Sequence, residues 1–278
     1  MLVVIKGAGD IATGIALRLH RARFKIIMTE IERPTAIRRT VSFSEAVPLG
    51  ETTVEGVTAE LAQNVAAARE IAARGHIAVL VDPQADCVRE LRPNAVVDAV
   101  LAKRNLGTGI ADAPVVVGVG PGFTAGVDCH AVVETQRGHT LGRVIMKGAA
   151  APNTGVPGNI GGYTLERLLR APADGVFHPA LEIGALVQPG QAAGYVDGVP
   201  MVCGISGILR GILPDGTPVQ QGMKSGDIDP RCKIEHCFTA SDKALSVGGG
   251  VLEAILRLTP LCEITLRGNG NGTGCETD

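Results

Sequence analysis

The chain has 278 residues, a length typical of roughly two domains. Apolar residues make up 45% of it and charged residues 19%, so the chain can bury a hydrophobic core. The formal net charge is −2 and Trp is absent, so neither a basic surface nor stacking aromatics indicates nucleic-acid binding. No apolar run approaches the ~18 residues of a membrane span, and the first residues predict a strand rather than a signal peptide. We therefore expect a cytoplasmic protein that contacts no membrane.

The first 112 residues alternate predicted strands and helices. Apolar spacing predicts one helix directly after the first strand and another over residues 58–74. Continuous apolar runs are typical of strands that are covered on both faces in a parallel sheet. The pattern therefore favours an α/β fold class with a Rossmann-like, doubly wound parallel sheet. The predicted strands are residues 2–5, 24–28, 77–81 and 96–97.

Short apolar pieces between Gly, Pro-Gly and Asp-Gly turns fill residues 176–235, which predicts a small all-β module. Its small-residue strands resemble the barrel-sandwich hybrid of biotinyl and lipoyl carriers. In those carriers the modified lysine lies at a hairpin tip, whereas Met223-Lys224 falls among the late strands. We therefore expect no prosthetic group on Lys224.

Five segments are expected along the chain. Apolar residues over 246–258 predict the helix of the fourth segment, and five of the first six residues of the stretch 267–278 are Gly or Asn, which predicts disorder. The segments are a Rossmann-like dinucleotide-binding domain (1–112), a Gly-rich middle α/β region (113–175), a barrel-sandwich-like β module (176–235), a C-terminal helix that returns to the α/β domain (236–262) and a disordered tail (263–278).

A glycine-rich turn follows the first predicted strand and opens the first helix. Its residues, from Gly7 to Gly14, fit the pattern G-x-G-x-x-(G/A). In that pattern Gly7 makes the tight turn, Gly9 lets the backbone approach a pyrophosphate, and Ala12 allows close packing of helix on strand. The pattern predicts a dinucleotide site, and the alternative is a vestigial Rossmann half that serves as scaffold.

Side chains around this turn refine the prediction. Asp10 and Ile11 begin the helix, whose N-terminus faces the anion, although Asp10 adds a negative charge there and is also an ordinary helix cap. Glu30 ends the second predicted strand, 21 residues after Gly9, where an acid binds ribose hydroxyls. NAD is the first choice by motif, and FAD and a molybdopterin dinucleotide are alternatives.

Three further stretches are candidates for ligand contact. Gly120 and Gly122 follow an apolar run and predict either an anion nest or a tight turn. Asp82 follows the run 77–81, at the strand end where ligands bind in α/β sheets. The Gly-rich stretch 153–162 is either a ligand loop or an interdomain linker.

No catalytic residue and no metal ligand set is assigned. The seven cysteines include no C-x-x-C pair, so a disulfide framework or a zinc site is not predicted. Cys232 and Cys237 flank Lys233 and His236 and have the most electropositive neighbourhood, which is where a sulfur- or selenium-carrying thiol is expected.

Six motifs together resemble one bacterial family, the accessory proteins of selenium-dependent molybdenum hydroxylases, labelled YqeB. The resemblance runs over about residues 1–258. It implies a maturation or accessory role, with the hydroxylase or its maturation factors and a small-molecule ligand as partners, and no defined reaction. An NAD(P)-dependent oxidoreductase of unknown substrate is the alternative function. The motifs are Lys6 to Gly14, Ala102 to Thr108, Gly120 to Asp128, Glu134 to His139, Lys224 to Arg231 and Gly248 to Ala254.

Overall fold

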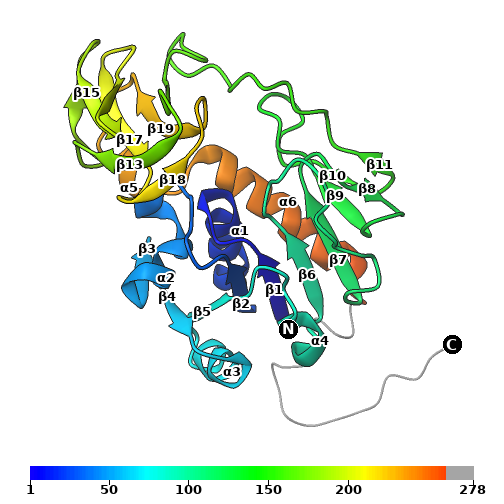
Figure 1. The fold of residues 1–278 in the computed structure, drawn as a ribbon. Coiled ribbons are helices and arrows are strands. Elements are labelled where there is room, and N and C mark those ends of the chain that lie inside the picture. The colour runs from blue at the N-terminus through cyan, green and yellow to red at the C-terminus, as the bar shows by residue number, and fades with distance from the viewer. Residues whose placement is uncertain (261–278) are drawn as a thin grey trace, which may run out of the picture.

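Nine strands form the central sheet of the chain, which a computed structural model describes over residues 1–260 (Figure 1). Their order is β10-β9-β7-β6-β1-β2-β5-β4-β3. Seven neighbouring strands, from β9 to β4, are parallel, while β10 and β3 are antiparallel at the two edges. The strands are β1 (Leu2–Lys6), β2 (Lys25–Glu30), β3 (Glu51–Val54), β4 (Val57–Ala62), β5 (Ile77–Val81), β6 (Ala95–Asp98), β7 (Val115–Val119), β9 (Ala131–Val133) and β10 (Val144–Ile145).

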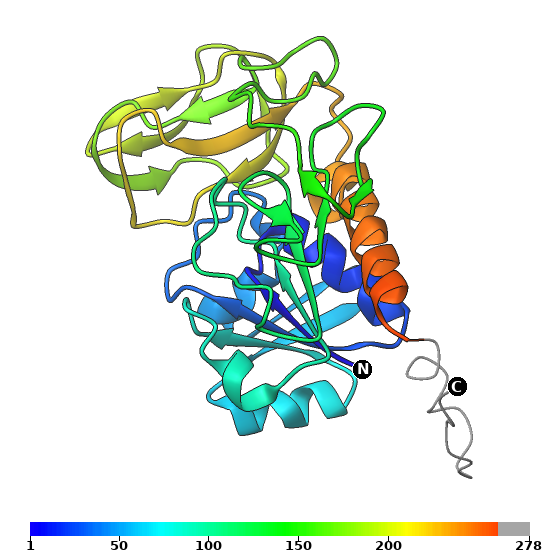
Figure 2. The ribbon, with the colours of Figure 1, turned by 90° about the vertical axis from the view of Figure 1, so that its right-hand side faces the viewer.

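Helices cover both faces of this sheet. Val3 and Ile5 of β1 point to one face and join the core of α1 (Asp10–Arg21) and α6 (Asp242–Leu258). Val4 points to the other face and joins the core of α3 (Val65–Ala73) and α4 (Cys87–Leu91). This alternation explains why β1 has no polar face. Figure 2 shows α1 and α6 side by side on one flank, with α3 and α4 away from them. We call the sheet and its helices the α/β body.

The second part of the chain is a β module of two four-stranded antiparallel sheets, seen within the described residues at the upper left of Figure 1. One sheet has the order β12-β19-β17-β14 and the other β16-β15-β13-β18. Between them lies a separate apolar core that includes Phe177, Leu209 and Ile228. The strands are β12 (Leu168–Arg170), β13 (Gly175–Pro179), β14 (Leu186–Val187), β15 (Ala192–Val196), β16 (Val199–Val202), β17 (Gly207–Ile212), β18 (Thr217–Val219) and β19 (Lys224–Asp229).

The described residues also include several short elements. A two-stranded sheet lies beside the body, and turns of 3₁₀ helix follow β2. The remaining elements are η1 (Arg39–Val41), η2 (Phe43–Glu45), α2 (Ala46–Leu49), β8 (Thr124–Ala125), β11 (Gly148–Ala149) and α5 (Glu235–Phe238). No helix in the described part of the chain is long and apolar enough to cross a membrane.

The predicted Rossmann-like, doubly wound sheet is wrong. In a dinucleotide-binding fold the third strand lies next to the second, but here β5 lies between β2 and β4. The chain after β2 makes 3₁₀ turns, α2 and the hairpin β3–β4 instead of a long crossover helix. Continuous apolar runs indicate that strands are buried on both faces. They do not indicate the order of the strands or whether the edge strands are antiparallel.

The prediction that the β module is a barrel-sandwich hybrid is also wrong. The module begins with β12, which precedes the predicted limit at residue 176. Lys224 begins β19, a strand that pairs with β12 on one side and with β17 on the other. One face of this sheet carries buried charges that turn toward the body, as described below, so the module does not stand apart as a carrier domain.

The helix predicted over 58–74 divides into a strand and a helix. Val57–Ala62 forms β4, in which Val57 pairs with Val54 of β3 and Ala59 to Ala62 pair with β5. The helix begins only at Val65, where the side chain of Asn64 accepts a hydrogen bond from the Ala67 amide at 2.9 Å. The predicted C-terminal helix is α6, and it packs on α1; the predicted tail over 263–278 lies outside the described residues.

Backbone contacts hold the β module on the body. The Ile212 amide in β17 donates to the Ile37 carbonyl at 2.7 Å, and Arg39 Nε donates to the Ile212 carbonyl at 3.0 Å. A Cβ atom at Gly211 would lie 2.8 Å from the Ile37 carbonyl oxygen, so this strand needs a glycine at the contact. The module is therefore joined to the body by direct pairing as well as by the two connecting segments of the chain.

Candidate functional site: a cationic cavity between the body and the β module

A cavity of about 660 Å³ opens where the β module faces the sheet. Its floor consists of residues that follow β1, β6, β7 and β9, four adjacent parallel strands. The carboxyl ends of parallel strands are where ligands bind in open α/β sheets. A volume of several hundred Å³ suits a ligand of nucleotide size. The β module, the Gly-rich loop 151–158 and the start of α6 supply the remaining walls.

The cavity wall is strongly cationic. Ten charged residues line it, of which eight are basic and only two are acidic. The whole chain has a net charge of −2, so this concentration of positive charge is local. The basic residues are Arg38, Lys103, Arg137, Arg167, Arg170, Arg210, Lys224 and Lys243, and the acidic residues are Asp10 and Asp227.

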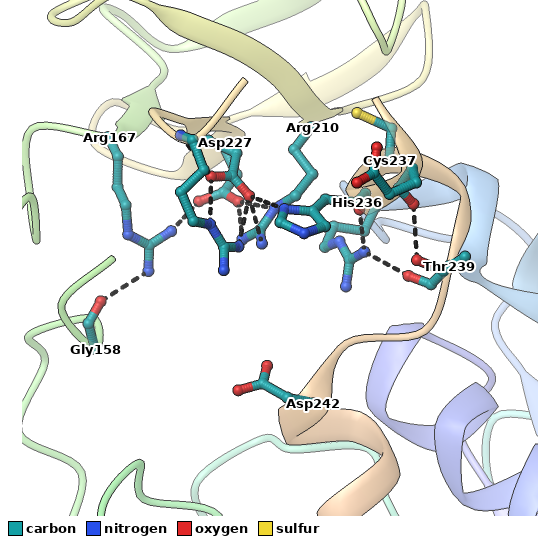
Figure 3. Close-up of polar contacts among 12 residues, drawn as sticks. Gly158, Arg167, Arg210, Asp227, His236, Cys237, Thr239 and Asp242 are labelled. Atoms are coloured by element: carbon teal, nitrogen blue, oxygen red, sulfur yellow. Dashed lines mark hydrogen bonds and ion pairs between the residues drawn. The ribbon is translucent and has the colours of Figure 1, made fainter. Parts of the chain in front are cut away.

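Buried ion pairs hold the arginines of the β module (Figure 3). Asp227 is 1% exposed and pairs with both Arg167 and Arg210; Arg210 Nε lies 2.8 Å from Asp227 Oδ2. Arg210 also lies 3.4 Å from the carboxylate of Asp229, which Arg231 binds at 2.7 Å. Two carboxylates therefore fix two arginines at the cavity wall, and the guanidinium groups retain donors for a ligand.

The pKa values of these groups follow from burial and charge. Burial acts to raise the pKa of Asp229, but hydrogen bonds from Arg231 and the charge of Arg210 outweigh it and hold the pKa well below its usual range. Burial lowers the pKa of Arg167 despite the opposing charge of Asp227. The pKa of Asp229 therefore follows its arginine partners rather than its burial.

Arg38 links three parts of the site. Its guanidinium pairs with Asp10 at the N-terminus of α1, 3.3 Å away. It also donates to the carbonyls of His236 and Thr239, at 3.0 and 3.2 Å, in the segment that connects the β module to α6. Burial lowers the pKa of Arg38, and the charge of Asp10 opposes that shift. Arg38 thus pairs with Asp10 at the start of α1 and fixes its carboxylate in place.

The Gly-rich loop is held by arginines from both sides. Gly158 lies against the side chain of Arg137, where a Cβ atom would meet Cδ, and its carbonyl accepts from Arg167 at 3.2 Å (Figure 3). Arg137 in turn binds both carboxylate oxygens of Asp242 in the first turn of α6, at 2.6 and 2.9 Å. That hydrogen bonding lowers the pKa of Asp242 to about 2.

A buried network fixes the loop that carries Lys103. Lys6 Nζ donates to Thr108 Oγ1 at 2.7 Å, and the Thr108 hydroxyl donates to Asp98 Oδ2 at 2.6 Å. Leu101 and Lys103, between the ends of this network, both adopt a positive φ, at 60° and 63°. Such conformations cost energy in non-glycine residues and persist where the surroundings impose them, often at functional sites.

The predicted glycine turn lies partly at the cavity. Gly9, Asp10 and Ile11 line it, and Gly9 is the N-cap of α1 without a side-chain cap. Gly7 adopts a φ of 90° next to the backbone of residues 99 and 100, and Ala12 is buried in the core between α1 and the sheet.

The two predicted acids lie elsewhere. Glu30 accepts hydrogen bonds from the amides of Ala8 and Ile31 at 3.0 and 2.8 Å, and it is not among the lining residues. Asp82 accepts from the amides of Asp86 and Cys87 at 3.0 and 2.9 Å, at the start of α4. Both carboxylates are bound to backbone amides.

Gly120 and Gly122 flank a lining residue, Pro121, but do not line the cavity themselves. A Cβ atom at Gly120 would lie 2.7 Å from Thr135 Oγ1, and one at Gly122 would lie 2.7 Å from the backbone of Arg104. Close packing within the protein therefore leaves no space for a side chain at either position.

The five cysteines within residues 1–260 do not line the cavity. Cys237 is buried, and burial raises its pKa, while Cys232 is exposed. In the described part of the chain, no cluster of three or more His, Cys, Asp or Glu residues is placed to hold a metal ion.

Sequence analysis missed most of the cations that make the site. Arg38, Arg167 and Arg210 lie in segments with no glycine motif, and Lys243 lies in the predicted C-terminal segment 236–262, before its helix. Three of the motifs quoted for the family resemblance do contain cations of the cavity wall, namely Lys103, Arg137 and Lys224.

Fold and site together define an α/β protein with a cationic ligand cavity. Over 257 residues the chain is 54% identical to "Uncharacterized protein YqeB" of Escherichia coli (strain K12), and the match covers 92% of this chain and 48% of that protein. The chain thus spans about half the length of this curated relative. The similarity supports the YqeB family indicated by the sequence motifs. No protein-family model matches the chain.

Two solved structures show a distant likeness. A succinylglutamate desuccinylase/aspartoacylase from Rhodobacter sphaeroides has a TM-score of 0.26 and 14% identity, over 82% of this chain and 85% of that one. An aspartoacylase family protein from Mesorhizobium loti has a TM-score of 0.28 and 13% identity, over 82% of this chain and 84% of that one. Both TM-scores are too low to define a shared fold.

Proposed function

We propose that this chain binds a phosphate-bearing small molecule in the cationic cavity. The observation that carries the proposal is the set of eight basic side chains against two acidic ones at the carboxyl edge of the sheet. Arginine forks, lysines and a helix N-terminus are the groups that bind phosphate oxygens in proteins. A dinucleotide-type ligand, such as NAD, FAD or a molybdopterin dinucleotide, is the first class to test.

The wider role we propose is that of an accessory protein in the maturation of a selenium-dependent molybdenum hydroxylase. The support is the motif resemblance and the similarity to YqeB, which matches this chain over about half of its own length. Deleting the gene in a host that makes such a hydroxylase should lower the selenium content and activity of that enzyme. Unchanged selenium content and activity in the deletion strain would contradict this role.

An NAD(P)-dependent oxidoreductase is the alternative. Such an enzyme needs a proton donor or acceptor beside the nicotinamide. The two acids in the cavity wall, Asp10 and Asp227, are both paired with arginines, which favours binding over acid–base chemistry. Transfer of deuterium from labelled NADH to a bound substrate would instead favour the oxidoreductase.

Calorimetric titration tests the binding proposal. NAD, NADP, FAD, a molybdopterin dinucleotide and inorganic pyrophosphate should be titrated into the full chain and into Lys103→Glu and Arg170→Glu, which reverse two exposed charges in the wall. At least one ligand should bind the wild type with a Kd below about 1 mM, and each reversal should weaken it about tenfold or more. Lys147→Glu, at an exposed lysine outside the cavity, serves as control. If no ligand binds the wild type below about 1 mM, the proposal is wrong.

A further inference from the structure

Three lysines carry the charge in the cavity that the protein leaves unmatched. Among residues 1–260 the arginines of the wall have protein partners: four pair with aspartates, and Arg170 donates to the Gly222 carbonyl at 2.8 Å. Within the same residues no carboxylate forms an ion pair with Lys103, Lys224 or Lys243, although all three line the cavity. Positive charge that lacks a partner in a confined site indicates an anionic ligand.

Two of these lysines line the same cavity as Asp10, the first residue of α1. Lys224 begins β19 of the β module, and Lys243 lies in the first turn of α6. Asp10 acts electrostatically on both lysines, and Lys224 acts on Lys243. Gly9 caps α1 there without a side-chain hydrogen bond, which leaves amides of the first turn for a ligand.

The position of Lys243 at a helix N-terminus is electrostatically unfavourable. The N-terminus of a helix carries partial positive charge and favours anions, whereas Lys243 adds a cation to the first turn of α6. Asp242 in the same turn is already bound by both nitrogens of Arg137. A bound anion would stabilise Lys243 together with the two helix termini that meet the cavity.

Orphaned donors in the wall support the same conclusion. Within the described chain, Nε of Arg38 and Nε of Arg167 are buried without a hydrogen-bond partner, and both residues are only 6% exposed while lining the cavity. Buried donors are almost always satisfied in native proteins, so an orphan in a cavity wall indicates a missing ligand or water.

We propose that Lys224, Lys243 and the N-terminus of α1 bind a terminal phosphoryl group, so that the ligand is a phosphomonoester or a nucleoside polyphosphate. This inference rests on the proposed function and narrows it. A terminal phosphoryl group carries about −1.5 to −2 charges at pH 7, whereas a phosphate esterified on both sides carries one. Lysine ammonium groups bind such a group as compact charges with three donors each. Two lysines of one cavity wall that have no carboxylate partner therefore match a terminal phosphate better than the internal pyrophosphate of a dinucleotide.

ADP and ADP-ribose form a matched pair of probes, because they differ in whether the second phosphate is terminal or esterified. Both are titrated calorimetrically into the full chain, with pyrophosphate and NAD beside them at equal ionic strength. ADP should bind about tenfold or more tightly than ADP-ribose. Lys224→Met and Lys243→Met should each weaken ADP about tenfold and change ADP-ribose by less than about twofold. The arginine variants Lys224→Arg and Lys243→Arg should keep the preference for ADP.

Lys233→Met is the control, since Lys233 is exposed and lies outside the cavity wall; it should leave both affinities unchanged. Thermal unfolding of each variant establishes that it is folded. If ADP-ribose and NAD bind as tightly as ADP, or if the lysine variants weaken both classes equally, the terminal-phosphate inference is wrong and the proposed function stands. If none of the four compounds binds, this inference is wrong; the proposed function fails as well only if NADP, FAD and a molybdopterin dinucleotide also do not bind.

Discussion

Gly14 of α1 lies directly against Ala244 of α6, where a Cβ atom at position 14 would come within 2.5 Å of the Ala244 Cβ atom. Gly248 makes the reciprocal contact, since a Cβ atom there would lie 2.7 Å from the Gly14 carbonyl oxygen. Helices whose backbones approach this closely leave no space for a side chain. The last glycine of the Gly7–Gly14 motif therefore serves helix packing.

Gly14→Ala should destabilise the protein, although alanine is the better helix former. In an exposed helix this change stabilises by about 1 kcal/mol, but here the added methyl group overpacks the contact with α6, at a cost of about 1–3 kcal/mol. Gly9→Ala is the matched control from the same motif, because Gly9 has a φ of −68° and a Cβ atom there would meet nothing within 4 Å. Urea unfolding should give Gly9→Ala a loss of less than about 1 kcal/mol. Equal losses for the two variants would contradict this assignment.

Two of the glycines predicted to contact a ligand lie against the backbone of the protein itself. Gly7 and Gly122 are both held at positive φ, and a Cβ atom at either would meet the backbone of residues 99–104, within 3.1 Å at Gly7 and 2.7 Å at Gly122. That loop is remote from Gly7 in the sequence. A glycine pattern indicates that another group approaches the backbone closely. It does not show whether that group belongs to the protein or to a ligand.

The cations of the site were not predictable for a similar reason. Lys224 and Lys243 reach the start of α1 only because the β module docks through Ile37 and Ile212 and α6 packs on α1. Continuous apolar runs predicted β1, β2, β5 and β6, since burial on both faces leaves a local signature. Docking between remote segments leaves none, so charge at an interface of this kind is visible only in the folded chain.

Glu30→Ala should lower stability and leave ligand affinity unchanged. The Glu30 carboxylate accepts hydrogen bonds from the amides of Ala8 and Ile31 at the end of β2, and its loss leaves those amides without that acceptor, at a cost of about 1–3 kcal/mol. Denaturant unfolding measures the loss, and calorimetry with the best ligand measures the affinity. Glu32→Ala, at an exposed neighbour, is the control. A drop in affinity with unchanged stability would restore the ribose-binding role expected from the motif.

Acid should remove the stability that Asp229 contributes. The folded pKa of Asp229 lies below its ordinary value of 3.8, because the arginine hydrogen bonds and charges outweigh burial. The contribution is therefore complete above pH ~4 and is lost as the pH falls toward the folded pKa. Asp229→Asn should cost about 2–3 kcal/mol at pH 7 and should flatten the fall in stability between about pH 4 and pH 2. The control is Asp86→Asn, because the side chain of Asp86 is 71% exposed. This variant should change stability by less than about 0.5 kcal/mol both at pH 7 and in acid. A variant with the same acid dependence as the wild type would argue against the role of Asp229.

Anion binding should take up protons at alkaline pH. Burial lowers the pKa of Lys224 and of Lys243 in the free protein, against the opposing charges of Asp227 and Asp10 on Lys224 and of Asp10 and Glu134 on Lys243. A bound phosphate favours the protonated lysines and raises both pKa values, so affinity is complete below the free-state pKa and falls as the pH rises through it.

Calorimetry with ADP or pyrophosphate between pH 7 and pH 10, in buffers of different ionisation enthalpy, measures this proton uptake directly. Uptake should increase with pH over that range and should decrease in Lys243→Met, whereas Lys233→Met should behave as the wild type. Arg137, which also acts on Lys243, stays charged throughout because its bond to Asp242 raises its pKa. Binding that releases protons, or whose affinity does not change up to pH 10, would mean that neither lysine contacts the anion.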